Sequence, residues 1–441
     1  MNILHYSLGF PPYRSGGLTK FNVDLMKEQA GAGHNVSLIW PGEISIFNDK
    51  TGIRHHRAVD GIGSYEVVNP LPVSYDEGIK EIPEFMKPGD KAVYREFLDK
   101  IQPDIIHIHS LMGLHNSLLE AAKEKGIRLV FSAHDYFPIC PKVTLYKNGG
   151  VCGTSHSCED CGSCNETALS IGKIKLLQSP IYRGLKDTGV VKLLRARHRD
   201  SFLMDRGDGV CGPSEKAPDY KRLRDHFYSM LRMMDMIHYN STLTKGIYEE
   251  HFELRDNKVI SITHSDITDQ RRVKSFSKYM IRMRYLGPLS AAKGFFVLKN
   301  ALDRLWTERR DFCLYVHFTP SEVPGYMKCC PRYSYNELEN VFNETDVLIC
   351  PSVCAETFGF TVLEALSFGV PVIISKNTGS KDILAEGTGI VFNDEEELFL
   401  SLRSLTSAKL GEMNRAITEK QEILSMKDLS ETLINSIYRQ E

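Results

Sequence analysis

No run of about 18 consecutive apolar residues occurs in this 441-residue sequence, so a membrane-spanning helix is not expected. The first ten residues lack the basic start and long apolar core of a secretory signal, and we interpret them as a first strand. Charge of one sign is not in excess either: 54 Lys and Arg against 56 Asp and Glu leave a net charge of -2. We therefore expect a cytoplasmic protein that does not bind nucleic acid.

No G-x-G-x-x-G motif follows a predicted strand, which argues against a dinucleotide-dependent oxidoreductase. What the sequence does contain is an alternation of short apolar runs with helical stretches. The first series has runs at 2–6, 36–40, 105–108 and 129–132, with helices expected over 18–30 and 114–125. A second series has runs at 259–262, 279–287, 312–318, 346–352, 371–375 and 389–392. Such runs are typical of parallel strands covered on both faces, so the predicted fold class is α/β with two Rossmann-like domains facing each other across a cleft.

The predicted domain boundaries follow from this rhythm. We expect an N-terminal domain over residues 1–240, interrupted at about 136–206 by an insertion that is rich in cysteine and then basic. A second domain is expected over 241–410. The remaining segment, 411–441, has helical periodicity and no strand, and we expect it to pack back on the first domain.

The segment 351–375, PSVCAETFGFTVLEALSFGVPVIIS, has the strongest chemical signal. A strand ends at Pro351, Glu356 lies in a short loop, and a helix that carries Glu364 begins near Phe358–Phe360. The N–H groups of a helix N-terminus bind anions, and Gly359 would let a diphosphate approach the backbone closely. The two carboxylates would then recognise sugar hydroxyl groups. A buried crossover helix with two exposed glutamates is the alternative interpretation.

This segment resembles the E-x7-E signature of family 4 retaining glycosyltransferases, which have the GT-B fold and act in bacterial polysaccharide biosynthesis. Other stretches resemble the family in the same order along the chain: PPYRSGGLTKFNVDLMKEQAGAGHNVSLI (11–39), PDIIHIHS (103–110), SAHDY (132–136) and YLGPLSAAKG (285–294). The resemblance implies a nucleotide-diphosphate sugar donor, UDP- or GDP-linked, and a glycan or lipid-linked acceptor. It also implies transfer chemistry that needs no metal.

The resemblance further implies roles for individual residues. His134, Glu356 and Lys293 would lie at the reacting centre, with Lys293 neutralising the diphosphate. Glu364 would bind the ribose of the nucleotide. The remaining substrate-binding residues would be Gly16, Gly17, Phe358, Gly359, Phe360 and Arg284. From the residues alone, Lys293 can equally be a surface lysine, the glycine pair a simple turn and His134 a structural histidine.

Three positions depart from the family pattern. Pro288 stands where the family has an arginine, so one counter-charge is missing, and Arg284 is our candidate to replace it. The stretch after residue 318 lacks the usual G-x-G-P loop, and Asp382 stands where a glutamate is usual. These departures support an alternative function, a catalytically weak GT-B scaffold that binds a partner or membrane through its insertion. Another GT-B enzyme, such as a synthase or phosphorylase that uses a sugar phosphate, is a further alternative.

Five cysteines fall within the insertion: Cys140, Cys152, Cys158, Cys161 and Cys164. Tight C-x2-C spacing suits tetrahedral thiolate coordination, and a structural zinc is the predicted cofactor. An iron–sulfur cluster and thiols without a metal are the alternatives. The basic stretch from Lys173 to Arg206, with Lys192, Arg195 and Arg199 on one helical face, predicts contact with the inner face of the cell membrane. A solvated helix face is the alternative.

Overall fold

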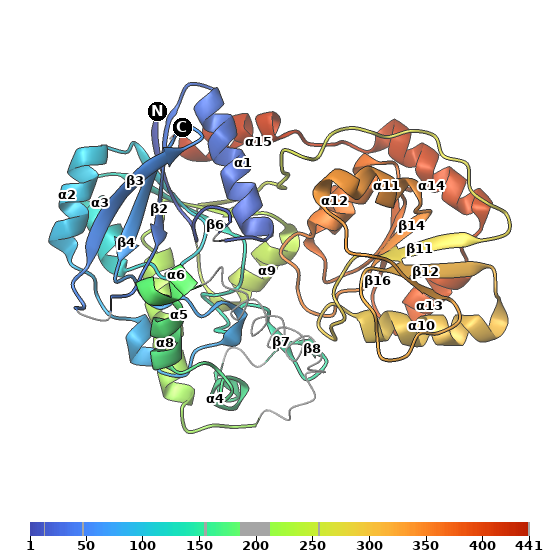
Figure 1. The fold of residues 1–441 in the computed structure, drawn as a ribbon, viewed down its shortest axis with the longest axis horizontal. Helices are drawn as coiled ribbons and strands as arrows, with labels where there is room; N and C mark the ends of the chain where they lie inside the picture. Colours follow the sequence, from blue (N-terminus) through green and yellow to red (C-terminus); the bar gives the residue numbers. More distant parts are fainter. Residues whose placement is uncertain (13, 46–47, 154–156, 186–211, 255, 440–441) are drawn as a thin grey trace.

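The computed structural model describes residues 1–12, 14–45, 48–153, 157–185, 212–254 and 256–439. It contains an eight-stranded and a six-stranded sheet, each in its own domain, and the two domains lie side by side (Figure 1). All strand pairs in both sheets are parallel except β3 with β4. The predicted α/β class with two parallel-sheet domains is confirmed.

The N-terminal sheet has the strand order β10-β9-β6-β5-β1-β2-β4-β3. Its strands are β1 (Asn2–Tyr6), β2 (Asn35–Pro41), β3 (Gly52–Val59), β4 (Ile62–Val68), β5 (Ile105–Ile108), β6 (Arg128–Ala133), β9 (Met236–Tyr239) and β10 (Asn257–Val259). The helices α1 (Gly17–Gly31), α2 (Lys91–Ile101), α3 (Asn116–Glu124), α8 (Ala217–Leu231) and α9 (Thr242–His251) belong to this domain. The central strands are buried along their length because helices cover both faces.

The predicted boundary at residue 240 is wrong. β10 pairs in parallel with β9, with Asn257 opposite Ile237, so β9, α9 and β10 form one more strand–helix–strand unit of the first sheet. Tyr248 of α9 is fully buried in the core of the first domain. The N-terminal domain therefore extends to Val259, and the apolar run that begins there does not open the second sheet.

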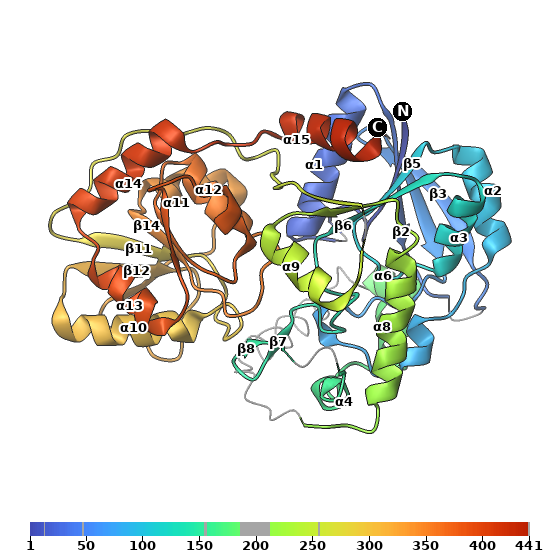
Figure 2. The same ribbon diagram turned by 180° about the vertical axis from the view of Figure 1, so that it is seen from behind.

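The insertion lies on the N-terminal domain beside the gap between the domains. It contains a small hairpin, β7 (Tyr146–Lys147) and β8 (Gly150–Val151), and the short helices α4 (Cys161–Cys164), α5 (Ile171–Leu177) and α6 (Pro180–Leu185). In both views the hairpin lies on the side of the domain that faces its neighbour (Figures 1 and 2). The predicted basic face with Lys192, Arg195 and Arg199 lies outside the described residues.

The C-terminal sheet has the order β13-β12-β11-β14-β15-β16. Its strands are β11 (Ile281–Tyr285), β12 (Phe312–Val316), β13 (Met327–Cys329), β14 (Val347–Cys350), β15 (Val372–Ser375) and β16 (Gly389–Phe392). Its helices include α10 (Phe295–Glu308), α11 (Leu338–Asn343), α12 (Phe360–Ser367), α13 (Glu395–Arg403) and α14 (Ser407–Lys420). The strand β14, the loop after it and α12 place the segment 351–360 at the edge that faces the first domain.

The last segment crosses back to the N-terminal domain. After α14, the chain continues into α15 (Met426–Leu433) and a short π-helix (Ile434–Tyr438). α15 lies against α1 in both views, and the two chain termini are neighbours (Figures 1 and 2). One hydrophobic cluster combines Ile3 and Phe21 of the first domain, Phe358 of the second and Leu433 of this segment. The domains therefore share a buried core as well as two connecting stretches of chain.

Among the described residues, no helix combines the length and the apolar character needed to cross a membrane.

Candidate functional site

A cavity of about 600 Å³ lies between the two domains. The N-terminal domain contributes His134 and Asp135, and the C-terminal domain contributes Pro288, Lys293 and the segment from Cys354 to Gly359. The insertion closes a third side with Lys142–Thr144, Tyr146–Asn148, Ser163, Cys164 and Thr167. That the insertion lines the cleft was not predicted from the sequence. The insertion and residue 356 are far apart along the chain, and no motif indicates that they meet.

The loop after β14 presents its backbone to this cavity. Gly359 has φ 101°, a left-handed conformation that favours glycine, and α12 begins directly after it. An added Cβ on Gly359 would lie 3.1 Å from Thr378 Cγ2 and 3.4 Å from Ser380 Oγ. The Oγ atom of Ser380 is buried and has no hydrogen-bond partner within the described structure. The first N–H groups of α12 and this hydroxyl form a set of donors suited to an anion.

Lys293 and Glu356 meet at this loop, with 3.2 Å between Nζ and Oε1. Burial alone would lower the pKa of Lys293, because it favours the neutral amine. The effect of the Glu356 carboxylate is larger than that of burial, so the pKa of Lys293 is raised. Lys293 therefore stays protonated at any physiological pH. Its position is fixed because the loop carbonyl of Ala292 accepts hydrogen bonds from the N–H groups of Val353 and Cys354, at 3.0 and 2.9 Å.

Backbone contacts join this loop to the opposite domain. The hydroxyl of Thr357 donates to the carbonyl of His134 at 3.0 Å, and Ser241 donates to the carbonyl of Thr357 at 2.7 Å. Asp382 accepts from the N–H and hydroxyl groups of Thr242, at 2.5 and 2.7 Å, at the start of α9. A carboxylate is favourable at a helix N-terminus. Asp382, which stands where the family usually has a glutamate, thus helps to hold the two domains together.

Gly16 and Gly17 lie where the first domain meets α12. Gly16 has φ 112°, and a Cβ added to Gly17 would lie 3.3 Å from the ring of Phe360. Phe358 is 3% exposed and belongs to the shared core, so its backbone faces the site while its ring does not. The structure thus brings Gly17 against Phe360, whereas nothing lies within 4 Å of a Cβ added to Gly16.

Glu364 is 4% exposed and accepts a hydrogen bond from His264 Nε2 at 3.2 Å. The rings of Tyr335 and Phe360 lie edge-on to His264, at 5.8 and 5.1 Å between ring centroids. Sequence reasoning missed His264 because it lies in the connection between domains, where no motif marks it. The structure therefore buries Glu364 on α12 against His264, and Glu364 is not among the residues that line the cleft cavity.

Arg284 is not brought to this site. It is 2% exposed at the end of β11, where its Nε donates to Thr345 Oγ1 at 2.6 Å and its Nη1 lies 2.9 Å from His317 Nε2. It is not among the residues that line the cleft cavity. The alternative source of a second positive charge is Lys142 of the insertion, which does line it.

His134 and Asp135 end β6 at the cavity wall. Burial lowers the pKa of His134 to about 3, so the imidazole is neutral. Burial raises the pKa of Asp135 to about 6, against hydrogen bonds from the Phe137 N–H at 2.9 Å and Ser110 Oγ at 3.1 Å. The ring of Phe21 packs on His134 with 4.7 Å between centroids. The site thus pairs a neutral histidine with a carboxyl group that titrates near neutrality.

Behind His134 lies a group of three buried histidines: His5, His107 and His109. One ring nitrogen from each comes within 4.8 Å of the others, a spacing compatible with a metal ion. However, both nitrogens of each ring already lie within hydrogen-bond distance of a protein group. A metal would have to displace these bonds, so we interpret the cluster as a hydrogen-bonded network.

The cysteines of the insertion gather around a small cavity, lined by Cys140, Cys152, Cys161 and Cys164. Cys158 interacts with Cys161, which lowers the pKa of the Cys158 thiol to about 7. Within the described chain, however, no three of these sulfur atoms come within 4.8 Å of one another. The thiols suit zinc by their chemistry but are not gathered into a complete ligand set, and the zinc site stays a prediction. His156, a lesser candidate ligand, lies outside the described residues.

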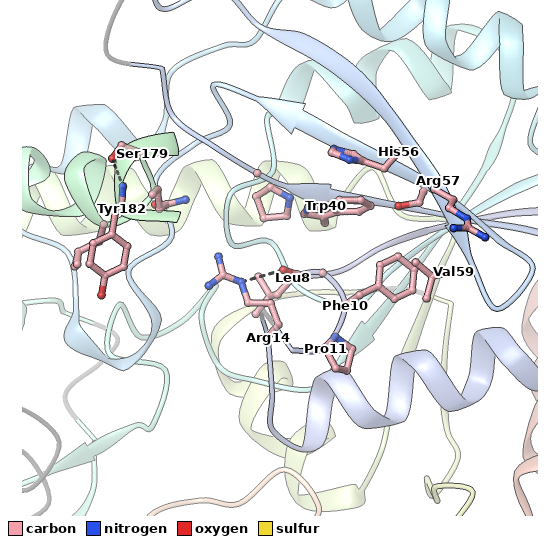
Figure 3. A pocket seen from close by; sticks show the side chains of 16 residues that line it. Leu8, Phe10, Pro11, Arg14, Trp40, His56, Arg57, Val59, Ser179 and Tyr182 are labelled. Carbon is pink, nitrogen blue, oxygen red and sulfur yellow. Dashed lines mark hydrogen bonds between the residues drawn. The ribbon is translucent and has the colours of Figure 1, made fainter. Parts of the chain in front are cut away.

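A second cavity, of about 400 Å³, opens on the N-terminal domain beside the loop before Gly16 (Figure 3). Trp40 forms its middle, with His56 on one side and Phe10 on the other, and Arg14 and Arg57 enter from opposite ends (Figure 3). None of the described residues that line it is acidic. His56 holds its place by a 2.7 Å contact with the buried carboxylate of Glu66. The cavity therefore offers aromatic surface and positive charge.

Comparison with known proteins decides the family. The model for glycosyltransferase family 4 matches residues 15–151, and the model for group 1 glycosyl transferases matches residues 327–422. The chain belongs to the family 4 glycosyltransferases. This family is a retaining family with the GT-B fold, and one match lies in each domain of this glycosyltransferase.

Two curated proteins are similar to this glycosyltransferase. It is 31% identical over 159 residues to the sulfoquinovosyl transferase SQD2 of Arabidopsis thaliana, covering 31% of this chain and 30% of that protein. It is 25% identical over 162 residues to an uncharacterized 42.6 kDa protein of the cps region of Klebsiella pneumoniae, covering 34% and 40%. The aligned parts thus span well under half the length of these relatives.

Solved structures share the whole fold. The sucrose-phosphate synthase of Thermosynechococcus elongatus has a TM-score of 0.58 at 13% identity, covering 98% of this glycosyltransferase and 97% of that chain. HepE of Anabaena, in complex with UDP and glucose, has a TM-score of 0.53 at 11% identity, covering 99% and 100%. At these identities the similarity establishes the GT-B architecture alone.

Proposed function

We propose that this protein transfers a sugar from a UDP-sugar to a hydroxyl group of a glycan or lipid-linked acceptor, with retention of anomeric configuration. The observation that supports the proposal most strongly is the meeting of Lys293, Glu356 and the N-terminus of α12 at one cavity between the domains. The complex of HepE with UDP and glucose favours UDP among the donor nucleotides. The relative from a cps region favours a role in assembling a cell-surface polysaccharide.

The proposed chemistry is the departure of a nucleoside diphosphate, which builds negative charge as the sugar–oxygen bond breaks. Lys293, the first N–H groups of α12 and Ser380 would stabilise this charge, with Lys142 supplying the second cation that Pro288 cannot. Among the described residues that line the cavity, no carboxylate other than Glu356, Asp135 and Asp76 is present. Glu356 is engaged by Lys293, so we favour front-face attack through an oxocarbenium-like state over a covalent sugar–enzyme intermediate.

Donor binding tests this proposal. UDP-, GDP- and ADP-sugars should be compared by thermal shift, and we expect UDP-sugars to raise the melting temperature because a ligand stabilises only the folded state. Glu364→Ala should weaken UDP binding by at least tenfold, measured by calorimetry. Glu339→Ala on α11, which removes an exposed carboxylate, is the control. Absence of binding by every nucleotide sugar would contradict the proposal and favour the scaffold.

The second cavity is the proposed acceptor site. Its cations, Arg14 and Arg57, match the phosphate groups of a lipid-linked acceptor, and Trp40 offers a face for a sugar ring. On the adjoining helices, Leu176, Leu177 and Ile181 are 43–56% exposed, and Leu177 lines the cavity. Exposed apolar residues beside a cationic cavity fit a lipid chain whose head group is a phosphate. This supports action at the inner face of the cell membrane.

Arg57→Glu should weaken binding of farnesyl diphosphate, a soluble probe with both features, by at least tenfold while UDP binding stays unchanged. Arg57 is the residue of choice because it is exposed and lies at the rim of the cavity. Arg222→Glu on α8 is the control for overall charge. Calorimetry measures the affinity of each variant for the probe. Competition by inorganic diphosphate separates recognition of the phosphates from recognition of the hydrocarbon chain. Equal affinity in both variants would rule out this cavity as the acceptor site.

A further inference from the structure

A continuous chain of hydrogen bonds runs through the N-terminal sheet, and its first part starts at a backbone carbonyl. The Nε2 atom of His238 lies 2.7 Å from the carbonyl oxygen of Ile260. His238 Nδ1 lies 2.6 Å from Ser132 Oγ, and Ser132 Oγ lies 2.7 Å from His107 Nε2. His107 Nδ1 lies 2.7 Å from the hydroxyl of Tyr438. The residue after β10, strands β9, β6 and β5, and the C-terminal π-helix are thereby connected.

The second part runs from Tyr438 to the cleft. Gln29 Nε2 lies 3.1 Å from the Tyr438 hydroxyl, and Gln29 Oε1 lies 2.8 Å from His5 Nε2. His5 Nδ1 lies 2.9 Å from His109 Nε2, and His109 Nδ1 lies 3.2 Å from His134 Nε2. His134 then lines the cleft cavity, and within the described chain its Nδ1 has no hydrogen-bond partner.

The imidazoles in this chain are neutral because burial lowers the pKa of each: to about 4 for His5 and His238, to about 3 for His134 and well below the usual value for His107 and His109. A neutral imidazole has one donor and one acceptor nitrogen, so the role of one nitrogen decides the other. A backbone carbonyl only accepts, and the direction of every bond therefore follows from Ile260.

The directions are obtained step by step. His238 donates from Nε2 to Ile260, so its Nδ1 accepts from Ser132, whose oxygen accepts from His107 Nε2. His107 Nδ1 then accepts the proton of Tyr438.

With its own proton given to His107, the Tyr438 oxygen accepts from the amide of Gln29, whose carbonyl oxygen accepts from His5 Nε2. His5 Nδ1 accepts from His109 Nε2, and His109 Nδ1 accepts from His134 Nε2. One arrangement of protons satisfies all eight bonds, and it leaves His134 with an unprotonated Nδ1 at the cavity.

We propose that this one-directional relay, anchored at Ile260 and passing through Tyr438, holds His134 as the Nε2–H tautomer and presents Nδ1 as an acceptor for a sugar hydroxyl. The role of Nδ1 rests on the proposed function, whereas the tautomer does not. Tyr438, Gln29, His5 and His109 are positioning residues that act on the site through His134. The C-terminal segment thus contributes to the site without touching substrate.

The test is ¹⁵N NMR of histidine-labelled protein, in which protonated and unprotonated ring nitrogens have different chemical shifts, with His134→Gln assigning the signal. We expect His134 and His5 to carry their protons on Nε2 in the wild-type protein. A proton on Nδ1 of either ring would overturn the proposal. This measurement uses the wild-type protein, so it depends neither on sugar transfer nor on the folding of a variant.

Tyr438→Phe removes one hydroxyl and leaves the Gln29 amide free to rotate. We expect a mixture of tautomers at His134 and a roughly tenfold lower kcat, about 1.4 kcal/mol of transition-state stabilisation, with little change in KM. Tyr228→Phe, which loses a hydrogen bond to the Glu253 carbonyl outside the relay, is the matched control. An unchanged tautomer at His134 in Tyr438→Phe would overturn the role of Tyr438. If the wild-type protein itself turned over no nucleotide sugar, that result would instead count against the proposed function and would leave the tautomer of His134 to be decided by NMR.

Discussion

Lys293→Met is expected to lower kcat/KM for a UDP-sugar by about 100- to 1,000-fold, the range found when one group that stabilises developing charge is removed. Methionine keeps the length of the side chain and removes the ammonium group that lies 3.2 Å from Glu356. The loss should appear mainly in kcat, because negative charge on the diphosphate increases as the bond to the sugar breaks. This loss in kcat is measured from the steady-state rate of UDP release, with water or an acceptor as the nucleophile.

Two further variants make this result specific. Lys299→Met, on α10, removes a half-buried charge that is paired with Asp303 in the same domain, and should leave kcat/KM within twofold. Lys142→Met should cause a smaller loss than Lys293→Met, because Lys142 reaches the cavity from the insertion and is not held by Glu356. A change of less than about threefold in Lys293→Met would contradict the position assigned to the diphosphate.

Gly17→Val is expected to lower kcat/KM by about 10- to 100-fold, because small displacements of the groups at a reacting centre have effects of this size. A Cβ at this position lies 3.3 Å from the Phe360 ring, and the two methyl groups of valine need space that the ring occupies. The start of α1 and the start of α12 must therefore separate. We expect small-angle scattering to report a more open molecule and kinetics to report the loss.

The same helix offers a control, since Gly31→Val adds a side chain where nothing lies within 4 Å. The variant Gly17→Val/Phe360→Leu should recover part of the activity, because leucine returns some of the space. If Gly17→Val had full activity, the close approach of the two domains at this point would not be needed for catalysis.

Much of the fold could be predicted from the sequence, because buried parallel strands have a strong apolar signal. β1 and β5 lie where the apolar runs place them, and α1 and α3 differ from the predicted helices by one or two residues at each end. The hairpin of β3 and β4 was not predicted, because edge strands such as β3 are mostly exposed and lack that signal. The boundary at residue 240 was wrong because β10 (Asn257–Val259) is short and mostly polar, and the apolar run that begins at its last residue resembles a strand of the second sheet.

The candidate site was predictable only where short motifs mark it. Glu356, Lys293 and Gly359 line one cavity, and Gly17 contacts Phe360 directly after Gly359. Each lies at the junction of a strand or loop with a helix. Arg284 was predicted to replace the arginine that is missing at Pro288, but its side chain donates to Thr345 within the C-terminal domain.

The contribution of the insertion to the cleft, and the partner of Glu364, depend on contacts between distant segments. His264 lies 100 residues before Glu364 in the chain. Such pairs are set by how the two domains come to rest against each other, and no local pattern in the sequence records them.

The crossing of the last helix has a consequence for biosynthesis. Ile3 and Tyr438 belong to one hydrophobic cluster, so the first domain acquires its full interior only after residue 438 has left the ribosome. Until then the strands synthesised first carry a row of histidines without their tyrosine partner. Synthesis of the segment around Tyr438 is thus coupled to maturation of the domain that emerged earliest.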